Sequence, residues 1–349
     1  MKEDLKHKKT KKSNSKFKKK YKKRRIFFVI SLLLLFIVGI IGFYVTNKLG
    51  KLNKDSSISV SKEDLGIDKA TEDTLNSFSS SDDVVNIALF GLDQRTEDEP
   101  CRSDAIIVLS VDTAHKKLKL TSIMRDSYVN IDGHGKDKLN HAYAYGGPQL
   151  AIKTLNQNFK LNITDYVSIN FFELEKLIDD LGGVVIDIKP AEVPFINDHM
   201  KEVASLTQTP VTPLKNSGSQ NLNGRQALAY SRIRYQGNGD YERTDRQRKV
   251  LEAIMHKVLN SNVSQYPALL DKLGPHVTTS LSNMEILSLG TSVVTSGTTN
   301  IEQVRFPYDG YFNDSGKMIG EVWYLPYDLD ETSNQIHEYI YNDNLPKSK

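Results

Sequence analysis

The sequence contains a single cysteine, Cys101, among its 349 residues. It cannot form an internal disulfide, so a fold that depends on disulfides for its stability is excluded. A catalytic thiol would need a histidine partner, which the sequence alone cannot place beside Cys101. We therefore interpret this cysteine as an incidental residue.

Several other signatures of chemistry are also missing. The sequence has no glycine-rich phosphate loop of the Walker type and no nucleophile elbow. Its eight histidines show no metal-binding spacing, since His134 and His141 lie seven residues apart in a loop rich in Gly, Asp and Tyr. There is no internal repeat. These absences argue against a P-loop enzyme, an α/β-hydrolase and a zinc enzyme.

The charge is distributed very unevenly along the chain. The net charge is +3, but residues 1–25 carry fourteen Lys or Arg against two acidic residues, which leaves about −9 for the rest. Residues 26–45 follow without a single charge. At about 1.5 Å per residue, a helix of this length spans roughly 30 Å, the thickness of the hydrocarbon core of a bilayer. The pattern predicts one transmembrane helix.

The basic tail indicates how this helix would be oriented. Lys and Arg gather on the cytoplasmic side of membrane spans, which places residues 1–25 in the cytoplasm and the large C-terminal part outside. Residues 44–47 lack a small-x-small cleavage site, so we expect an uncleaved signal anchor and a single-pass type II protein of the cell membrane. The tail is then a topology signal and an anchor to acidic lipid headgroups, not a site for nucleic acid.

The exported part divides into a polar segment and a folded domain. Residues 46–81 are rich in Ser, Lys, Asp and Asn with little apolar periodicity, which predicts a flexible stalk, with room for a short helix. We expect the folded domain to occupy residues 82–349. Strands are predicted at 84–90, 105–111, 117–123, 166–169, 184–188 and 301–306. Helices are predicted from about 148 to 159, 171 to 181, 224 to 230 and 244 to 259. Residues 189–220 are predicted to be an insertion loop. Alternating strands and helices favour an α/β layered domain.

Arginines are concentrated in one stretch of this domain. Six of them lie between residues 225 and 248: Arg225, Arg232, Arg234, Arg243, Arg246 and Arg248. Arg232 and Arg234 would point to the same side of an extended segment. Arg243 and Gln247 are one helical turn apart at a helix start, with Arg246 on a similar face. Guanidinium groups match phosphate oxygens in pairs, so we expect an anion site.

Two aspartates could complete such a site. Asp93 follows a strand that ends in glycine, and Asp104 begins the next strand, so adjacent strands could bring both carboxylates to one edge. Carboxylate and phosphate oxygens are the ligands that Mg²⁺ prefers. Arg95 and Arg102 could flank the metal. Such aspartates can equally serve as turn or cap residues, and Arg125 with Asp126 can be an ordinary ion pair.

Ten motifs in order give the chain a resemblance to a known family. They are Gly91-Leu-Asp-Gln-Arg95, Arg102-Ser-Asp104, Ser122-Ile-Met-Arg-Asp126, Lys138-Leu-Asn-His-Ala142, Gly146-Gly-Pro148, Leu181-Gly-Gly-Val184, Asn223-Gly-Arg-Gln-Ala-Leu228, Tyr230-Ser-Arg-Ile-Arg234, Gly239-Asp-Tyr-Glu-Arg243 and Asp245-Arg-Gln-Arg248. Over residues 82–260 the chain resembles the LytR-CpsA-Psr family of cell-envelope proteins. Met124 stands where that family usually has proline.

The resemblance implies a central mixed β-sheet sandwiched by helices, and a phosphotransferase that acts outside the membrane. Such an enzyme moves teichoic acid or capsular polysaccharide, with its proximal phosphate, from an undecaprenyl-diphosphate carrier to a muramic-acid hydroxyl of peptidoglycan. By position, Asp93 and Asp104 would hold magnesium. The groups that would grip the diphosphate are Arg102, Arg125, Arg232, Arg234, Arg243 and Gln247. The lipid tail would need an apolar slot between the sheet and its helices.

Some assignments stay open at this point. Asp126 and Asp240 are both candidates for the base that activates the acceptor hydroxyl. The same phosphate-binding residues could serve a phosphohydrolase that uses water as the acceptor. They could also serve a non-catalytic, membrane-bound regulator of envelope synthesis that only binds polyprenyl phosphates.

Overall fold

The computed structural model describes Gly50 and residues 52–93, 101–207, 210–234, 239–313 and 315–348. No helix within these ranges is both long and apolar enough to cross a bilayer. The predicted transmembrane helix at residues 26–45 lies outside the described residues. Residues 51–349 form one compact unit, and this unit is described below.

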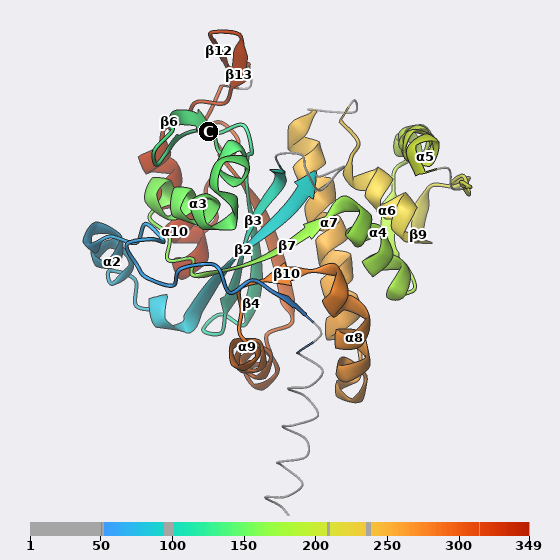
Figure 1. Ribbon diagram of the computed structural model, residues 1–349, viewed down its shortest axis with the longest axis horizontal. Helices are drawn as coiled ribbons and strands as arrows, with labels where there is room; N and C mark the ends of the chain where they lie inside the picture. Colours follow the sequence, from blue (N-terminus) through green and yellow to red (C-terminus); the bar gives the residue numbers. More distant parts are fainter. Residues whose placement is uncertain are drawn as a thin grey trace, which may run out of the picture. The chain divides into compact units, whose positions relative to one another are not determined.

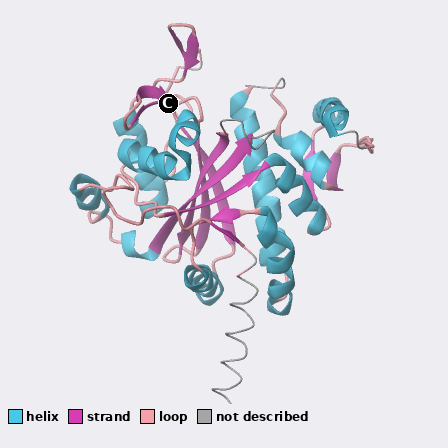
Figure 2. Ribbon diagram, in the orientation of Figure 1, coloured by secondary structure: helices cyan, strands magenta, loops and turns pink. Residues whose placement is uncertain are grey.

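A seven-stranded mixed sheet forms the centre of this unit (Figures 1 and 2). Its strand order is β1-β10-β7-β2-β3-β4-β11. Three consecutive strands, β2, β3 and β4, pair antiparallel, whereas β7 joins β2 and β11 joins β4 in parallel. The strands are β1 (Asn53–Lys54), β2 (Val84–Asp93), β3 (Arg102–Asp112), β4 (Lys117–Ile123), β7 (Asp165–Asn170), β10 (Thr278–Thr279) and β11 (Asn300–Phe306). The predicted central mixed sheet is confirmed.

Helices cover both faces of this sheet. On one face, buried side chains of the sheet pack against α3 (His141–Phe159) and α10 (Leu329–Asn342). On the other face, a smaller apolar cluster joins the sheet to α7 (Asp240–Leu259) and α9 (Asn283–Ser296). Both faces of the sheet carry apolar side chains because successive residues of a strand point to opposite sides.

A second apolar core lies beside the sheet. It is built by α4 (Phe171–Asp180), α5 (Val193–Thr207), α6 (Gly224–Ser231) and α8 (Tyr266–Leu273), together with the small sheet of β8 (Val184–Ile188) and β9 (Gly218–Leu222). Local signals start two of these helices: the side chain of Asn170 accepts from the backbone N–H of Glu173, and Asn223 forms a capping box with Gln226. The predicted insertion loop at 189–220 is wrong, since α5 lies within it.

Residues 53–81 belong to the folded unit, so the stalk predicted over residues 46–81 is wrong for this stretch. β1 pairs with β10, and α2 (Lys69–Leu75) begins at Asp68, whose side chain accepts from Thr71. Leu65 and Leu75 are buried in the main core. The few apolar residues are widely spaced here, and their partners lie far along the chain, so periodicity does not reveal them. The folded domain therefore begins well before residue 82.

Two short hairpins lie at the upper end of the molecule in Figure 1, beyond the ends of β2 and β3. One pairs β5 (Tyr128–Ile131) with β6 (Gly135–Lys138), and the other pairs β12 (Lys317–Ile319) with β13 (Val322–Tyr324). Next to them α3 is broken at Gly146 and Gly147, and Pro148 follows the break. The φ of Gly147 is +62°, which a residue with a side chain rarely adopts.

Candidate functional site

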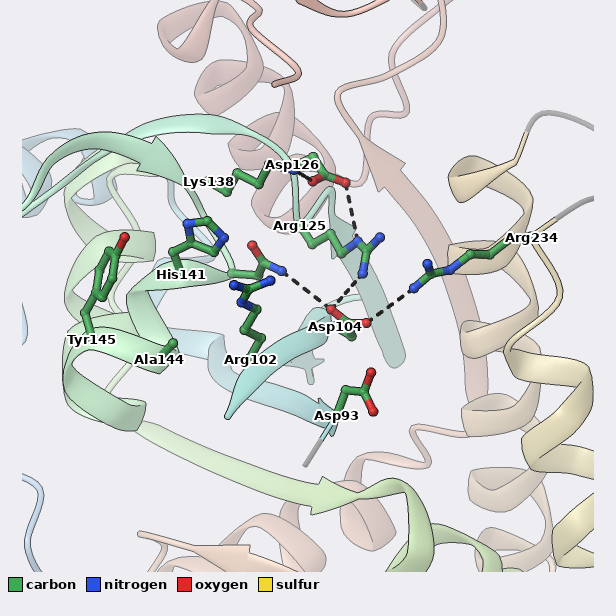
Figure 3. Close-up of a pocket in the computed structure, with 11 residues that line it drawn as sticks. Asp93, Arg102, Asp104, Arg125, Asp126, Lys138, His141, Ala144, Tyr145 and Arg234 are labelled. Atoms are coloured by element: carbon green, nitrogen blue, oxygen red, sulfur yellow. Dashed lines mark hydrogen bonds and ion pairs between the residues drawn. The ribbon is translucent and has the colours of Figure 1, made fainter. Parts of the chain in front are cut away.

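The main candidate site is a pocket of about 770 Å³ where β2 ends and β3 begins. Figure 3 shows how its side chains converge from several separate elements. Its lining residues are Asp93, Arg102, Asp104, Arg125, Asp126, Lys138, Asn140, His141, Ala144, Tyr145 and Arg234. Ten of these eleven residues are polar or charged. Asp93, Arg102 and Asp104 meet here because β2 and β3 place their polar ends at the same edge of the sheet.

An irregularity in the sheet aims Asp104 at the pocket. The register of β2 and β3 shifts between Gly91 and Leu92: Gly91 faces Ala105, but Leu92 faces Ser103. Asp104 is therefore the extra residue of a β-bulge on β3. Bulges bend a strand and redirect a side chain, and they are frequent next to functional sites. Asp93 at the end of β2 faces Arg102, so both carboxylates that were predicted to share one edge line the same pocket.

Asp104 lies at the centre of an ion-pair network. Its Oδ1 is 2.7 Å from Nη1 of Arg125, and its Oδ2 is 3.5 Å from Nη2 of Arg234. Nη1 of Arg243 is 3.9 Å from the same Oδ2. Burial alone would raise the pKa of Asp104, but the charges of Arg125 and Arg243 outweigh it and lower the pKa below its usual value. Asp104 is thus held as a carboxylate.

Arg125 connects three aspartates. Besides Asp104, its Nε lies 3.0 Å from Oδ2 of Asp240 and 3.3 Å from Oδ2 of Asp126. Burial would lower the pKa of this guanidinium, but the three carboxylates raise it above its ordinary value. Lys138 adds a second cation to Asp126, at 2.6 Å. Asp126 and Asp240 are therefore both ion-paired in the structure.

The pocket keeps an excess of positive charge despite these pairs. Four fixed cations line it: Arg102, Arg125, Lys138 and Arg234. Three carboxylates line it: Asp93, Asp104 and Asp126. Arg234 is 44% exposed, and its contacts with acids in the described part of the chain are long, so its donors remain available to a ligand. Such a lining suits an anion with several oxygens, such as a diphosphate.

Two arginines that were predicted to belong to the anion site, Arg243 and Arg246, do not line the pocket. Arg243 is buried and pairs with Asp240 at 2.9 Å, next to Arg125. Its burial and the charge of Arg125 lower the pKa of Arg243 to about 10. Arg246 is not brought to the pocket at all. Its buried guanidinium pairs with Glu192 at 2.9 Å and with Glu242 at 2.7 Å.

The remaining predicted residues lie outside the pocket lining. Arg232 is the C-cap of α6 and has helical φ and ψ, so the predicted extended segment at 232–234 is wrong at its first residue. The Arg232 guanidinium lies 5.2 Å from the ring centroid of Phe171. Gln247 is half-buried on α7, one turn after Arg243. Arg95 lies outside the described residues.

The sequence reasoning gave no role to several residues that line the pocket. Lys138 ends β6, Asn140 is the N-cap of α3, and His141 and Tyr145 lie in its first turns. Asn140 donates to Oδ1 of Asp104 over 3.5 Å. One available signal was the group of polar residues from Asp137 to His141, interrupted by Leu139, at the start of a helix.

Cys101 lies close to the pocket without being part of its lining. Burial raises the pKa of this thiol to about 11, and the carboxylates of Asp93 and Asp104 act in the same direction. Nucleophilic cysteines need the opposite environment, because the reactive form is the thiolate. The interpretation of Cys101 as an incidental residue is consistent with this setting.

Comparison with known proteins places this geometry in a family. The sequence model of the LytR_cpsA_psr family matches residues 48–339 of this chain. A polyisoprenyl-teichoic acid–peptidoglycan teichoic acid transferase TagU from Oceanobacillus iheyensis is 32% identical over 320 residues, which cover 89% of this chain and 91% of that protein. The TagU of Enterococcus faecalis is 37% identical over 237 residues, which cover 66% and 72%.

Solved structures show the same fold. TagT (YwtF) of Bacillus subtilis, solved with bound octaprenyl pyrophosphate lipid, is 26% identical and superposes with a TM-score of 0.54 over 76% of this chain and 92% of that one. The match to the family model begins at residue 48, before β1, and ends within α10. It therefore includes both apolar cores. The chain therefore belongs to the LytR-CpsA-Psr family.

Proposed function

We propose that this protein is a polyisoprenyl-diphosphate glycopolymer–peptidoglycan phosphotransferase. It moves teichoic acid or capsular polysaccharide, with its proximal phosphate, from undecaprenyl diphosphate to a muramic-acid hydroxyl of peptidoglycan. The observation that carries the proposal is the pocket at the end of β2 and β3, where four cations outnumber three carboxylates. The names of the TagU and TagT relatives support the same reaction and the same class of donor.

The donor diphosphate would lie among the cations of this pocket. Arg102 and Arg234 offer exposed guanidinium donors at two sides of it, and Arg125 lies between them (Figure 3). Phosphoryl transfer requires little covalent chemistry from the protein, so positioning and charge neutralisation account for most of the catalysis. The leaving group is polyprenyl monophosphate, and the same cations stabilise the negative charge that develops on its oxygen.

The pocket also fits a magnesium ion. Mg²⁺ in phosphate sites is held by one or two carboxylates, with phosphate oxygens and water completing its octahedron. Asp93 and Asp104 line the pocket from adjacent strands, and the pKa of Asp104 is lowered. Within the described ranges no group of three or more metal-binding side chains occurs, so the protein would supply two carboxylates and the substrate the rest. When bound, Mg²⁺ would neutralise charge on the diphosphate.

The lipid tail of the donor would need an apolar surface, and the face of the sheet that α7 covers is our candidate for it. Leu251, Met255 and Leu259 on α7 are only half-buried, although they face the sheet. They pack against a cluster of sheet residues that includes Ile107 and Leu120. Incompletely buried apolar side chains between a helix and a sheet are what an isoprenoid chain could cover. The structure of TagT with octaprenyl pyrophosphate supports this class of ligand.

The expected location follows from the sequence. Residues 26–45 would anchor the chain in the cell membrane, with residues 1–25 in the cytoplasm and the folded unit outside. Both the lipid-linked donor and peptidoglycan are then within reach of the pocket.

The decisive experiment is a reconstituted transfer reaction. The full chain, purified in detergent, is mixed with a polyprenyl-diphosphate-linked glycan, Mg²⁺ and a peptidoglycan oligomer, and products are followed by mass spectrometry with and without chelator. We expect a glycan-phosphate-peptidoglycan adduct that disappears with the chelator or with Asp93→Asn combined with Asp104→Asn. Release of polyprenyl monophosphate without an adduct would instead indicate a phosphohydrolase. Tight lipid binding without turnover for several glycans would indicate a regulator.

A further inference from the structure

His141 occupies an unusual position on the wall of the pocket. It is the first residue of α3, and its side chain lines the pocket between Tyr145 and the Arg125–Asp104 pair (Figure 3). Its Nδ1 lies 2.9 Å from Oδ2 of Asp137 on β6. Among the residues that the structure describes, none bonds to its Nε2. Asp137 therefore holds Nδ1, and Nε2 is available to contact a substrate.

The surroundings of Asp137 keep its carboxylate in place to accept a hydrogen bond from Nδ1 of His141. It also accepts hydrogen bonds from the hydroxyls of Tyr145 (2.6 Å) and Tyr324 (3.2 Å). Burial would raise the pKa of Asp137, but the hydrogen bonds from Tyr145 and His141 outweigh it and bring the pKa to about 2. An ionised carboxylate can only accept, so Nδ1 of His141 must carry a proton. In the neutral imidazole, Nε2 then holds the lone pair.

The carboxylates that the sequence suggested as bases are in a different state. Asp126 is paired with Lys138 at 2.6 Å, and Asp240 with Arg243 at 2.9 Å. Arg125 contacts both of them. Cations therefore engage both oxygens of Asp126 and Oδ2 of Asp240. Of these candidates, His141 alone presents an unoccupied lone pair to the pocket.

Other histidines show what separates this arrangement from an ordinary ion pair. His115 has the same contact, with Nδ1 2.8 Å from Oδ2 of Asp112, but it lies in the turn between β3 and β4, at the opposite end of β3 from the pocket. His276 has both ring nitrogens engaged, one by Glu173 and the other by Asp180. An orienting carboxylate is thus common in this chain, and among the described histidines only His141 combines it with a place in the pocket wall.

We propose that His141 is the general base of the transfer reaction, with Asp137 as its positioning residue. The inference rests on the proposed function. In the step, the acceptor hydroxyl oxygen forms a bond to the glycan-linked phosphorus, and the bond from that phosphorus to the bridging oxygen breaks. The electron pair of the broken bond leaves with polyprenyl monophosphate. The hydroxyl proton moves to Nε2, and the imidazolium is stabilised by the Asp137 carboxylate, as in other oriented histidine bases.

The test compares kinetic constants of full-chain variants in the transfer assay. His141→Gln should lower kcat by about 100-fold or more, the usual contribution of a positioned base, with little change in KM for the lipid-linked donor. His141→Ala should fall similarly and recover part of its kcat on addition of free imidazole. Asp137→Asn should lower kcat without changing donor KM, because an amide no longer fixes the tautomer.

The matched control is His115→Gln, which alters the same kind of His–Asp pair far from the pocket and should leave kcat unchanged. A His141→Gln variant that keeps most of the wild-type kcat would overturn the assignment and leave the transferase intact. A fall in kcat without imidazole rescue of His141→Ala, accompanied by a lower melting temperature, would show a structural role and also overturn it. Absence of transfer by the wild-type chain would overturn the proposed function itself.

Discussion

Arg234 and Arg246 lie close together in the sequence and carry the same charge, yet the fold uses them in opposite ways. Arg246 is 3% exposed, with short contacts to Glu192 and Glu242. Arg234 is 44% exposed, and its nearest carboxylates are 3.5 and 4.0 Å away. The first is neutralised inside the protein, and the second faces an open, cation-rich pocket. Pairing, not arginine density, therefore separates arginines that stabilise the fold from those available to a ligand.

The rest of the arginine-rich stretch follows the same division. Arg225 pairs with Glu175 at 2.8 Å, and Arg248 donates to Gln303 over 3.2 Å. Arg243 stands between the two groups, since it is buried like Arg246 but belongs to the network of Asp104.

The largest effect is expected for Arg246→Met. The change leaves the buried carboxylate of Glu192 without its cation, and breaking a buried pair costs about 3–5 kcal/mol. The free energy of unfolding, measured with urea, should fall by this amount, while the remaining folded protein keeps its transfer activity. Glu192→Met added to Arg246→Met should restore much of the loss. Unchanged stability of the single variant would contradict a structural role for Arg246.

Arg234→Met should show the reverse behaviour. Losing one good donor to the developing phosphoryl charge costs about 3 kcal/mol, or roughly 100-fold in kcat/KM. Because the side chain is largely exposed, its removal should change the free energy of unfolding by no more than about 0.5 kcal/mol. Both quantities are measured on the same preparation. Full activity, or a large loss of stability, would remove Arg234 from the ligand-binding group.

Arg243→Met tests the intermediate case. Burial and repulsion from Arg125 lower the pKa of Arg243 to about 10 in the folded protein. Because the guanidinium is still charged at neutral pH, this charge lowers the free energy of unfolding. The urea midpoint of the variant should equal or exceed that of the wild type, whereas transfer activity should fall. A clearly lower midpoint would mean that the pair with Asp240 outweighs this cost.

The smallest effect concerns the pH dependence of Asp104→Asn. Because the folded pKa of Asp104 is lowered, its contribution to stability is present above its unfolded value of about 3.9 and is lost as the pH falls through the folded pKa. The difference in free energy of unfolding between wild type and variant should therefore be constant above about pH 5 and shrink below about pH 4. Urea titrations across this range measure it. A difference independent of pH would contradict the shift.

The main sheet could be predicted from the sequence because its signals are local. Apolar runs at 84–90, 105–111 and 117–123 lie within β2, β3 and β4, and the helical spacing of 244–259 lies within α7. The helix α5 was missed because Pro194 reads as a break, although proline is tolerated in a first turn. The spacing of Ile196, Met200 and Val203, all buried, was the available signal.

The candidate site was only partly predictable for a similar reason. Strand order places Asp93 and Asp104 at one edge, and this follows from two adjacent strands. The bulge at Asp104 depends on a register shift that no residue pattern announces. The ion pair of Arg246 depends on Glu192, which lies in a different element and far away in the sequence. Pairwise long-range contacts thus decided which charged residues were free for function.

The break in α3 at Gly146 and Gly147 separates two parts of one helix that have different surroundings. After the break, residues such as Ile152 and Leu155 are fully buried in the main core. Before it, the first turns present His141 and Tyr145 to the pocket. Substitutions at His141 or Tyr145 can therefore alter the chemistry of the pocket wall without touching these buried residues. The break therefore allows side chains of one helix to change at the pocket while the packing of the later turns stays the same.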